Sequence, residues 1–169
     1  MNGNTLSIAG PGTTTLTATQ AGDINFTAAL PLTQSLKVSQ TFANVMGAVS
    51  PSSDSDNDGV NALLEYAFGG AANRNDRDRI PVTSFSNNEL SLTYLARTDD
   101  TSLSILPEVN TDLTSNSGWV SSATPNSGIT VTSLGTVDIN GTPFERRRAT
   151  VAVDGSGAKF MRVKIILNQ

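Results

Sequence analysis

The chain has 169 residues, with 11 Lys and Arg against 15 Asp and Glu, a formal net charge of −4, and neither cysteine nor histidine. This acidic balance disfavours nucleic acid and anionic membrane surfaces as main partners. The absence of cysteine and histidine excludes disulfides, thiolate and imidazole metal sites, and catalysis through these side chains.

Targeting signals are not visible in the chain. No run of 18 apolar residues is present, so we expect no transmembrane helix. The first four residues include neither a basic region nor an apolar stretch, so we expect no signal peptide within the chain. The Thr- and Ser-rich, charge-poor composition is typical of bacterial extracellular β-proteins. We therefore expect a secreted or cell-surface location, with this chain as part of a longer precursor.

Residues 1–39 are predicted to form a partial β segment. Residues 5–8, 13–19 and 33–38 are rich in Thr, Leu and Val and read as strands separated by glycine-containing turns. Three strands cannot build a two-layer core alone. We expect their apolar face to be covered by strands outside this chain, by the calcium-loop helix predicted below, or by a second copy of the chain, which would give a homodimer.

This first segment resembles the closing strands of a bacterial Ig-like repeat, on the basis of residues 12–26 and 32–38. The resemblance implies a turn at Gly22 and Asp23 and an aromatic residue packed near the corner, a place that Phe26 occupies. The earlier strands of such a repeat are missing from this sequence.

Residues 40–79 are predicted to contain a linker, a calcium-binding loop and a helix. Residues 42–49 favour a short helix or an irregular turn, and residues 51–53 read as linker. Residues 54–65 then match the pattern D-x-[DN]-x-[DN]-G-x5-E of a calcium loop. The alternative interpretation of these residues is an acidic, solvated turn that caps the following helix.

Each constrained position of the loop has a chemical role. Carboxylates at the first, third and fifth positions point inward, Gly59 permits the sharp bend, and a glutamate at the twelfth position binds with both oxygens. Asn57 suits a positive φ. Oxygen ligands in a roomy loop favour calcium over magnesium. The predicted ligands are the carboxylates of Asp54, Asp56, Asp58 and Glu65 and the backbone carbonyl of Val60.

A helix is predicted after the loop, because residues 60–68 are mostly good helix formers and Gly69-Gly70 ends them. No helix is expected directly before Asp54, so the motif is half an EF-hand. It resembles the calcium loops of dockerins and thrombospondin type-3 repeats, and a segment near the ends of many large secreted bacterial proteins. A structural clamp is favoured over a switch, because paired hands and a Met-rich groove are missing.

Acidic and basic residues alternate in residues 73–79. One interpretation is a second metal site that uses Asp76 and Asp78. The favoured interpretation is a solvated loop with local ion pairs, because three arginines are interleaved with the acids.

Residues 80–169 are predicted to form a C-terminal β-sandwich of six or seven short antiparallel strands. Apolar residues alternate in residues 90–96, 103–109 and 161–167, and Asn140-Gly141 marks a hairpin. The fold class expected for the chain is mainly β, an Ig-like or jelly-roll-like antiparallel sandwich with one short helix after the calcium loop. This half resembles the β-domain that follows the calcium loop in secreted bacterial proteins.

Two further features of the C-terminal part have two interpretations each. Trp119 would either stack on a sugar ring or pack against the domain, and packing is favoured. Residues 146–148, three arginines in a row, would either bind an anion or protect a solvated edge, and protection is favoured.

The function expected from these observations is a non-catalytic, calcium-stabilised structural or adhesive module of a secreted or surface bacterial protein, whose partner would be a surface protein or an extracellular glycan. The alternative is a carbohydrate-binding accessory module of an extracellular degradative enzyme. An enzyme in its own right is disfavoured, because only four glutamates are present and the sequence contains no close carboxylate pair typical of glycosidases.

Overall fold

The computed structural model describes residues 5–10, 12–114, 117–155 and 157–168 and divides into two compact units, Met1–Gln40 and Thr41–Gln169. Each unit is considered by itself. As predicted, the protein is mainly β, with 43% of its residues in strands and 9% in helices. Among the residues that the structure describes, no helix combines the length and apolar character needed to span a bilayer.

The first unit is built on one antiparallel hairpin. Strand β1 (Gly12–Ala18) pairs with β2 (Leu32–Val38), and Gly12 lies opposite Val38. The turn expected at Gly22 and Asp23 is present, because the Asp23 carboxylate accepts hydrogen bonds from the amides of Asn25 and Phe26. The strand expected at residues 5–8 is wrong: only Thr5 makes a bridge. Four residues without a continuous partner strand do not offset their ordering entropy.

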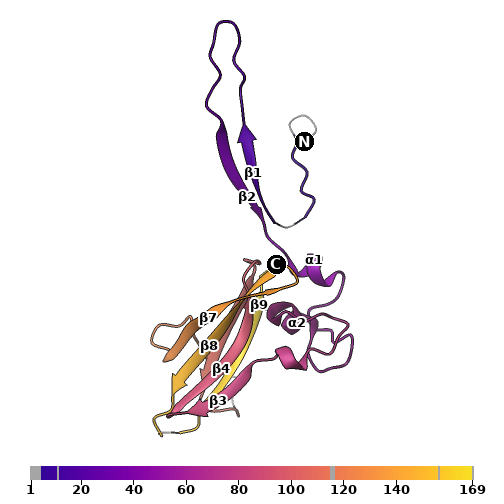
Figure 1. Ribbon diagram of the computed structural model, residues 1–169. Helices are drawn as coiled ribbons and strands as arrows, with labels where there is room; N and C mark the ends of the chain where they lie inside the picture. The colour runs from indigo at the N-terminus through magenta and orange to yellow at the C-terminus, as the bar shows by residue number, and fades with distance from the viewer. Residues whose placement is uncertain (1–4, 11, 115–116, 156, 169) are drawn as a thin grey trace. The chain divides into compact units, whose positions relative to one another are not determined.

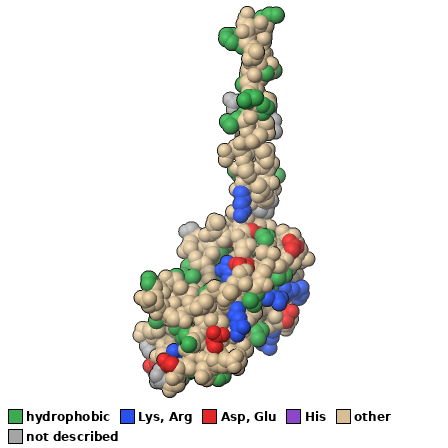
Figure 2. Space-filling model, turned by 60° about the vertical axis from the view of Figure 1, so that its left-hand side comes forward, with side chains coloured by type: hydrophobic (Ala, Val, Ile, Leu, Met, Phe, Trp, Pro, Cys, Tyr) green, Lys and Arg blue, Asp and Glu red, His purple; other side chains and the backbone are tan. Residues whose placement is uncertain are grey.

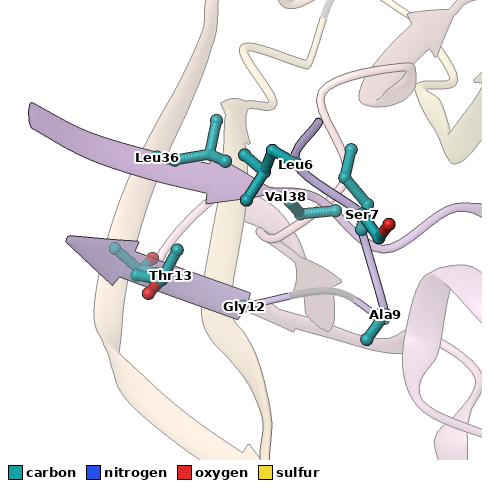
Figure 3. A pocket seen from close by; sticks show the side chains of 10 residues that line it. Leu6, Ser7, Ala9, Gly12, Thr13, Leu36 and Val38 are labelled. Atoms are coloured by element: carbon teal, nitrogen blue, oxygen red, sulfur yellow. The ribbon is translucent and has the colours of Figure 1, made fainter. Parts of the chain in front are cut away.

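Apolar side chains of the first unit remain largely uncovered. Phe26 is 72% exposed, so it does not pack at a corner as the Ig-like resemblance implies. Leu6, Leu36 and Val38 converge on a shallow hollow beside the hairpin (Figure 3). Charge is scarce in residues 1–40, which contain only Asp23 and Lys37 as ionisable side chains.

The second unit contains a four-stranded and a three-stranded antiparallel sheet (Figure 1). The first sheet has the order β3 (Val82–Ser86), β4 (Glu89–Arg97), β8 (Thr142–Ala152), β7 (Ile129–Ile139). The second has the order β6 (Val120–Ser121), β5 (Leu103–Asn110), β9 (Phe160–Leu167). The hairpin predicted at Asn140-Gly141 is confirmed, since both residues have positive φ between β7 and β8.

The apolar core lies between these two sheets. Alternate residues of β4 and β8 contribute Tyr94, Ala96 and Ala149 from one side, and β5 contributes Ile105 from the other. The sequence does not single out strand β3. All five of its residues are exposed, so it has little apolar alternation to detect.

Two short helices complete the second unit, together with the 3-10 turn Arg77–Arg79. Helix α1 (Phe42–Met46) lies in the segment for which the sequence favours either a short helix or an irregular turn, and the helix is the one observed. Helix α2 (Ala62–Phe68) follows the predicted calcium loop and ends at Gly69, whose φ of 83° permits the left-handed cap. Ala67 and Phe68 of α2 enter the sandwich core.

A second apolar cluster joins the two helices. Phe42 and Met46 of α1 pack against Ala62 and Tyr66 of α2. The rings of Phe42 and Tyr66 meet edge to face, with their centroids 5.4 Å apart. Helix α2 is therefore held by apolar contacts on two sides, and the loop before it is attached to a fixed element.

Candidate metal centre

Residues 54–61 form a loop that leads into α2, without a helix directly before it, and the first four residues of α2 complete the twelve-residue motif. The base of the loop is fastened by two backbone hydrogen bonds, from the amide of Ala62 to the carbonyl of Ser53 (2.8 Å) and from the amide of Leu63 to the carbonyl of Pro51 (3.0 Å). Asn61 caps the helix, because its side chain accepts a hydrogen bond from the amide of Leu64. The loop and the helix that follows it therefore lie where the sequence predicts them.

The conformation of the loop turns its carboxylates inward. Asn57 and Gly59 both have positive φ, 61° and 88°, and make the bend. The Asp54 carboxylate accepts hydrogen bonds from the amides of Gly59 (2.8 Å) and Asp58 (3.2 Å). The amide of Asp58 also reaches a carboxylate oxygen of Asp56 at 3.2 Å. These backbone donors fix the side chains from within the loop.

Three of the predicted ligands come together directly. Asp54, Asp56 and Asp58 each offer a carboxylate oxygen, and these oxygens all lie within 4.8 Å of one another. Asp58 is only 4% exposed. Val60, predicted to offer its carbonyl, is also buried, and its amide donates a 2.7 Å hydrogen bond to the Asp58 carboxylate.

Glu65 is a predicted ligand that is almost fully buried, at 2% exposure, and has one carboxylate oxygen, Oε2, without a hydrogen-bond partner among the described residues. Burial and the nearby carboxylates of Asp56, Asp58, Asp76 and Asp54, in this order, raise its pKa to about 7. An ionised carboxylate in such a place calls for a cation, and a second orphaned atom, Asp56 Oδ2, lies in the same loop.

The segment after α2 folds back over the loop, which the sequence did not indicate. The amide of Asp76 donates a 2.6 Å hydrogen bond to Oδ2 of Asp58, and the guanidinium of Arg77 donates to the Asp58 carbonyl. Asp76 is fully buried and pairs with Arg74, whereas the side chain of Asp78 is 76% exposed. In the sequence, Gly69-Gly70 indicates that the helix ends and the chain can reverse direction. It does not indicate whether Asp76 or Asp78 is buried against the loop.

The other residues singled out in the sequence are engaged in local contacts. The guanidinium of Arg162 covers one face of the Trp119 ring at 4.0 Å. Within the arginine run, Arg147 pairs with Glu145 at 2.6 Å and Arg148 with Glu89 at 3.5 Å. These contacts are those of a packed tryptophan and of a surface with mixed charges.

The chain matched no family model, no curated protein and no solved structure in the comparisons made. Its function is therefore inferred from the geometry of the candidate metal centre.

Proposed function

We propose that this protein is a non-catalytic, calcium-stabilised structural or adhesive module of a secreted or cell-surface bacterial protein. The observation that carries the proposal is Oε2 of Glu65, a buried carboxylate oxygen that has no hydrogen-bond partner among the described residues and lies near three inward-facing aspartates. A cation at this place would satisfy the orphaned oxygen and relieve the repulsion between the carboxylates.

The donor set fits calcium. Asp54, Asp56 and Asp58 have carboxylate oxygens close enough together to share one ion. Glu65 would add a further carboxylate, and the buried backbone at Val60 would supply the carbonyl that such loops use. The four carboxylates outweigh the charge of one divalent ion, so binding would leave the site anionic. Calcium accepts a large and irregular oxygen shell, whereas magnesium requires a small octahedron and keeps several waters.

The role proposed for the ion is a clamp. The loop is contiguous with α2, and α2 contributes Tyr66, Ala67 and Phe68 to the apolar clusters of the second unit. Fixing the loop therefore fixes the start of a helix on which part of the core depends. Binding to the folded state alone adds to the stability of that state.

The ion pairs of the remaining glutamates support a non-catalytic role. Glu89, Glu108 and Glu145 each pair with an arginine, so each carries a neutralising partner. The alternative, a carbohydrate-binding module, has less support. A sugar ring would stack on a tryptophan face, and Arg162 already covers one face of the Trp119 ring.

Thermal melting of the full chain tests the proposal. We expect millimolar calcium to raise the melting midpoint by about 5 °C or more relative to chelator, and magnesium to raise it less. Identical midpoints in calcium and chelator would contradict the calcium site. A magnesium shift as large as the calcium shift would contradict the assignment of the metal.

A further inference from the structure

Asp76 is the most deeply buried charged residue near the loop, and it lies 18 residues after Asp58 in the chain. Its relative exposure is 0%. A buried carboxylate requires donors, and Asp76 has them: the Ala71 amide reaches Oδ2 at 2.6 Å, and Arg74 donates to Oδ1 through Nε at 3.0 Å and through a second nitrogen. Both oxygens of Asp76 are therefore occupied by donors of its own segment.

The backbone amide of Asp76 is directed at the candidate metal centre, whereas its side chain pairs with Arg74. Its amide donates a 2.6 Å hydrogen bond to Oδ2 of Asp58. Oδ1 of the same carboxylate accepts from the Val60 amide at 2.7 Å. Two backbone donors from different parts of the chain thus fix both oxygens of one predicted ligand, and only the donor at Asp76 depends on the fold of residues 71–79.

Gly70 provides the space for this arrangement. A side-chain Cβ built at Gly70 would lie 2.7 Å from Oδ2 of Asp76, closer than such atoms approach in proteins. The chain thus passes over the Asp76 carboxylate at a residue that has no side chain. The tight fit and the three donors hold the Asp76 backbone at one place relative to the loop.

We propose that Asp76 is a positioning residue of the calcium site, which acts through its buried carboxylate to hold the amide that orients Asp58. This inference rests on the proposed calcium site and goes beyond it by assigning a residue outside the loop. Asp76 is distinguished from the proposed ligands by its ion pair with the guanidinium of Arg74, since no carboxylate of the loop has such a cationic partner among the described residues. Outer-shell partners of metal ligands typically change affinity by about 10- to 100-fold when they are altered.

Calcium titration calorimetry on the full chain compares Asp76→Asn with Asp78→Asn. Both variants remove one carboxylate from the same segment, but Asp78 is mostly exposed and its nearest described cation, Arg79, is 3.8 Å away. We expect Asp76→Asn to weaken calcium binding by about 10-fold or more, and Asp78→Asn by less than about 2-fold. Equal effects of the two variants would overturn the proposal, because they would reflect charge alone.

For the variant Arg74→Gln, a positioning role of Asp76 and simple electrostatics predict opposite changes in calcium affinity. Loss of a positive charge near an anionic site raises cation affinity by electrostatics alone, and it would also free Asp76 if Asp76 were a ligand. We expect affinity to fall instead, because the Asp76 carboxylate loses a holding partner. A rise in affinity overturns the proposal. The side chain of Arg74 is 56% exposed, so this variant decides the question even if Asp76→Asn does not fold.

Terbium luminescence distinguishes a loss of Asp58 from the metal's ligands from a general loosening of the loop. Lifetimes in light and heavy water count the water molecules on a bound lanthanide, which takes the place of calcium. We expect about one more water in Asp76→Asn than in the unaltered chain, because Asp58 no longer holds its place. An unchanged count would overturn the positioning role. Absence of calcium and terbium binding in the unaltered chain would instead overturn the proposed function itself.

Discussion

The charge of Glu65 is not balanced by any described hydrogen-bond partner at Oε2, and this side chain lies next to four aspartates. Replacing it by glutamine removes the charge and keeps the shape. We expect Glu65→Gln to melt higher than the unaltered chain in chelator above pH 7, because a buried repulsion is lost, and to lose most of the calcium-induced shift. Melting curves with and without calcium measure both effects.

Glu89→Gln is the matched control for this variant. Glu89 is a half-exposed glutamate that pairs with Arg148 at 3.5 Å, outside the metal centre. It should keep the calcium shift and change the midpoint in chelator very little. Unaltered calcium affinity in Glu65→Gln would show that the assignment of the twelfth loop position is wrong.

The raised pKa of Glu65 also predicts a dependence of stability on pH. In the metal-free fold this carboxyl keeps its proton up to about pH 7, whereas the unfolded chain loses it near the ordinary value of 4.5. Between these values the native state binds more protons, so the free energy of unfolding falls as pH rises, in total on the order of 3 kcal/mol. A calcium ion bound at Glu65 would keep it ionised and remove this fall.

Urea unfolding from about pH 5 to pH 8 in chelator and in calcium measures the effect. The chain has no histidine, the side chain that normally titrates in this window. A free energy of unfolding that rises with pH in chelator would contradict the burial of Glu65. The same slope in chelator and calcium would contradict its role as a ligand.

The sequence was sufficient to predict that the three loop aspartates cluster, but not the surroundings of this cluster. Asp54, Asp56 and Asp58 come together because the spacing and the positive φ of Gly59 are properties of one short loop. The burial of Asp76 depends on how residues 71–79 return over that loop, a contact between distant parts of the sequence. No local pattern encodes such a contact.

Helix α2 is the element through which the loop meets the sandwich, and Tyr66 makes the polar link. Its hydroxyl donates a 2.7 Å hydrogen bond to Asp100, and its carbonyl accepts one from Arg97 at 2.9 Å. Burial alone would raise the pKa of Asp100, but hydrogen bonds from Ser102 and Tyr66 outweigh it and lower the pKa. The guanidinium of Arg97 lies over the rings of Tyr66 and Phe144.

We expect Tyr66→Phe to destabilise the second unit by about 1–2 kcal/mol, because a buried carboxylate loses a donor. Tyr94→Phe is the control: the Tyr94 hydroxyl is buried near Arg147 but makes no hydrogen bond of good geometry with a described residue. It should be neutral or slightly stabilising. Urea unfolding at neutral pH compares the two, and equal costs would contradict the link through Asp100.

The elements that were predicted well carry strong local patterns. Strands β4, β5 and β9 show apolar alternation because one face of each lies on the core. The Asn140-Gly141 turn is specified by the two residues themselves. Strand β3 is exposed on both faces, and its place in the sheet is set by pairing with β4 rather than by its own residues.

At the scale of the whole molecule, the two units differ in the contacts that stabilise them. The first is a two-stranded hairpin, a structure that is marginal in water by itself, whereas the second has its own two-sheet core. We expect a chain of residues 41–169 to fold and to retain the full calcium-induced rise in melting temperature. Loss of structure in that truncated chain would show that the hairpin is required by the rest.

Sedimentation of the full and truncated chains tests the homodimer expected from the hairpin. The first unit leaves Ile8, Ile24, Phe26, Leu30 and Leu32 exposed, and it carries little charge. Figure 2 shows apolar side chains along it. A concentration-dependent dimer that disappears on removal of residues 1–40 would agree with pairing through these strands. A dimer that persists in residues 41–169 would contradict it.

The two ends of the second unit are fastened to the same apolar cluster. Phe42, near its start, is part of this cluster with Tyr66, and Leu167, near its end, packs against it. A force that pulls the two ends apart would therefore act on α1 and on the end of β9 before it separates the paired strands within the sheets. Tyr66 follows Glu65 directly on α2, and Phe42 and Leu167 pack on the cluster that contains Tyr66. A cation bound at Glu65 would therefore stiffen the helix that resists this force. Calcium would then set the tension at which the unit begins to yield.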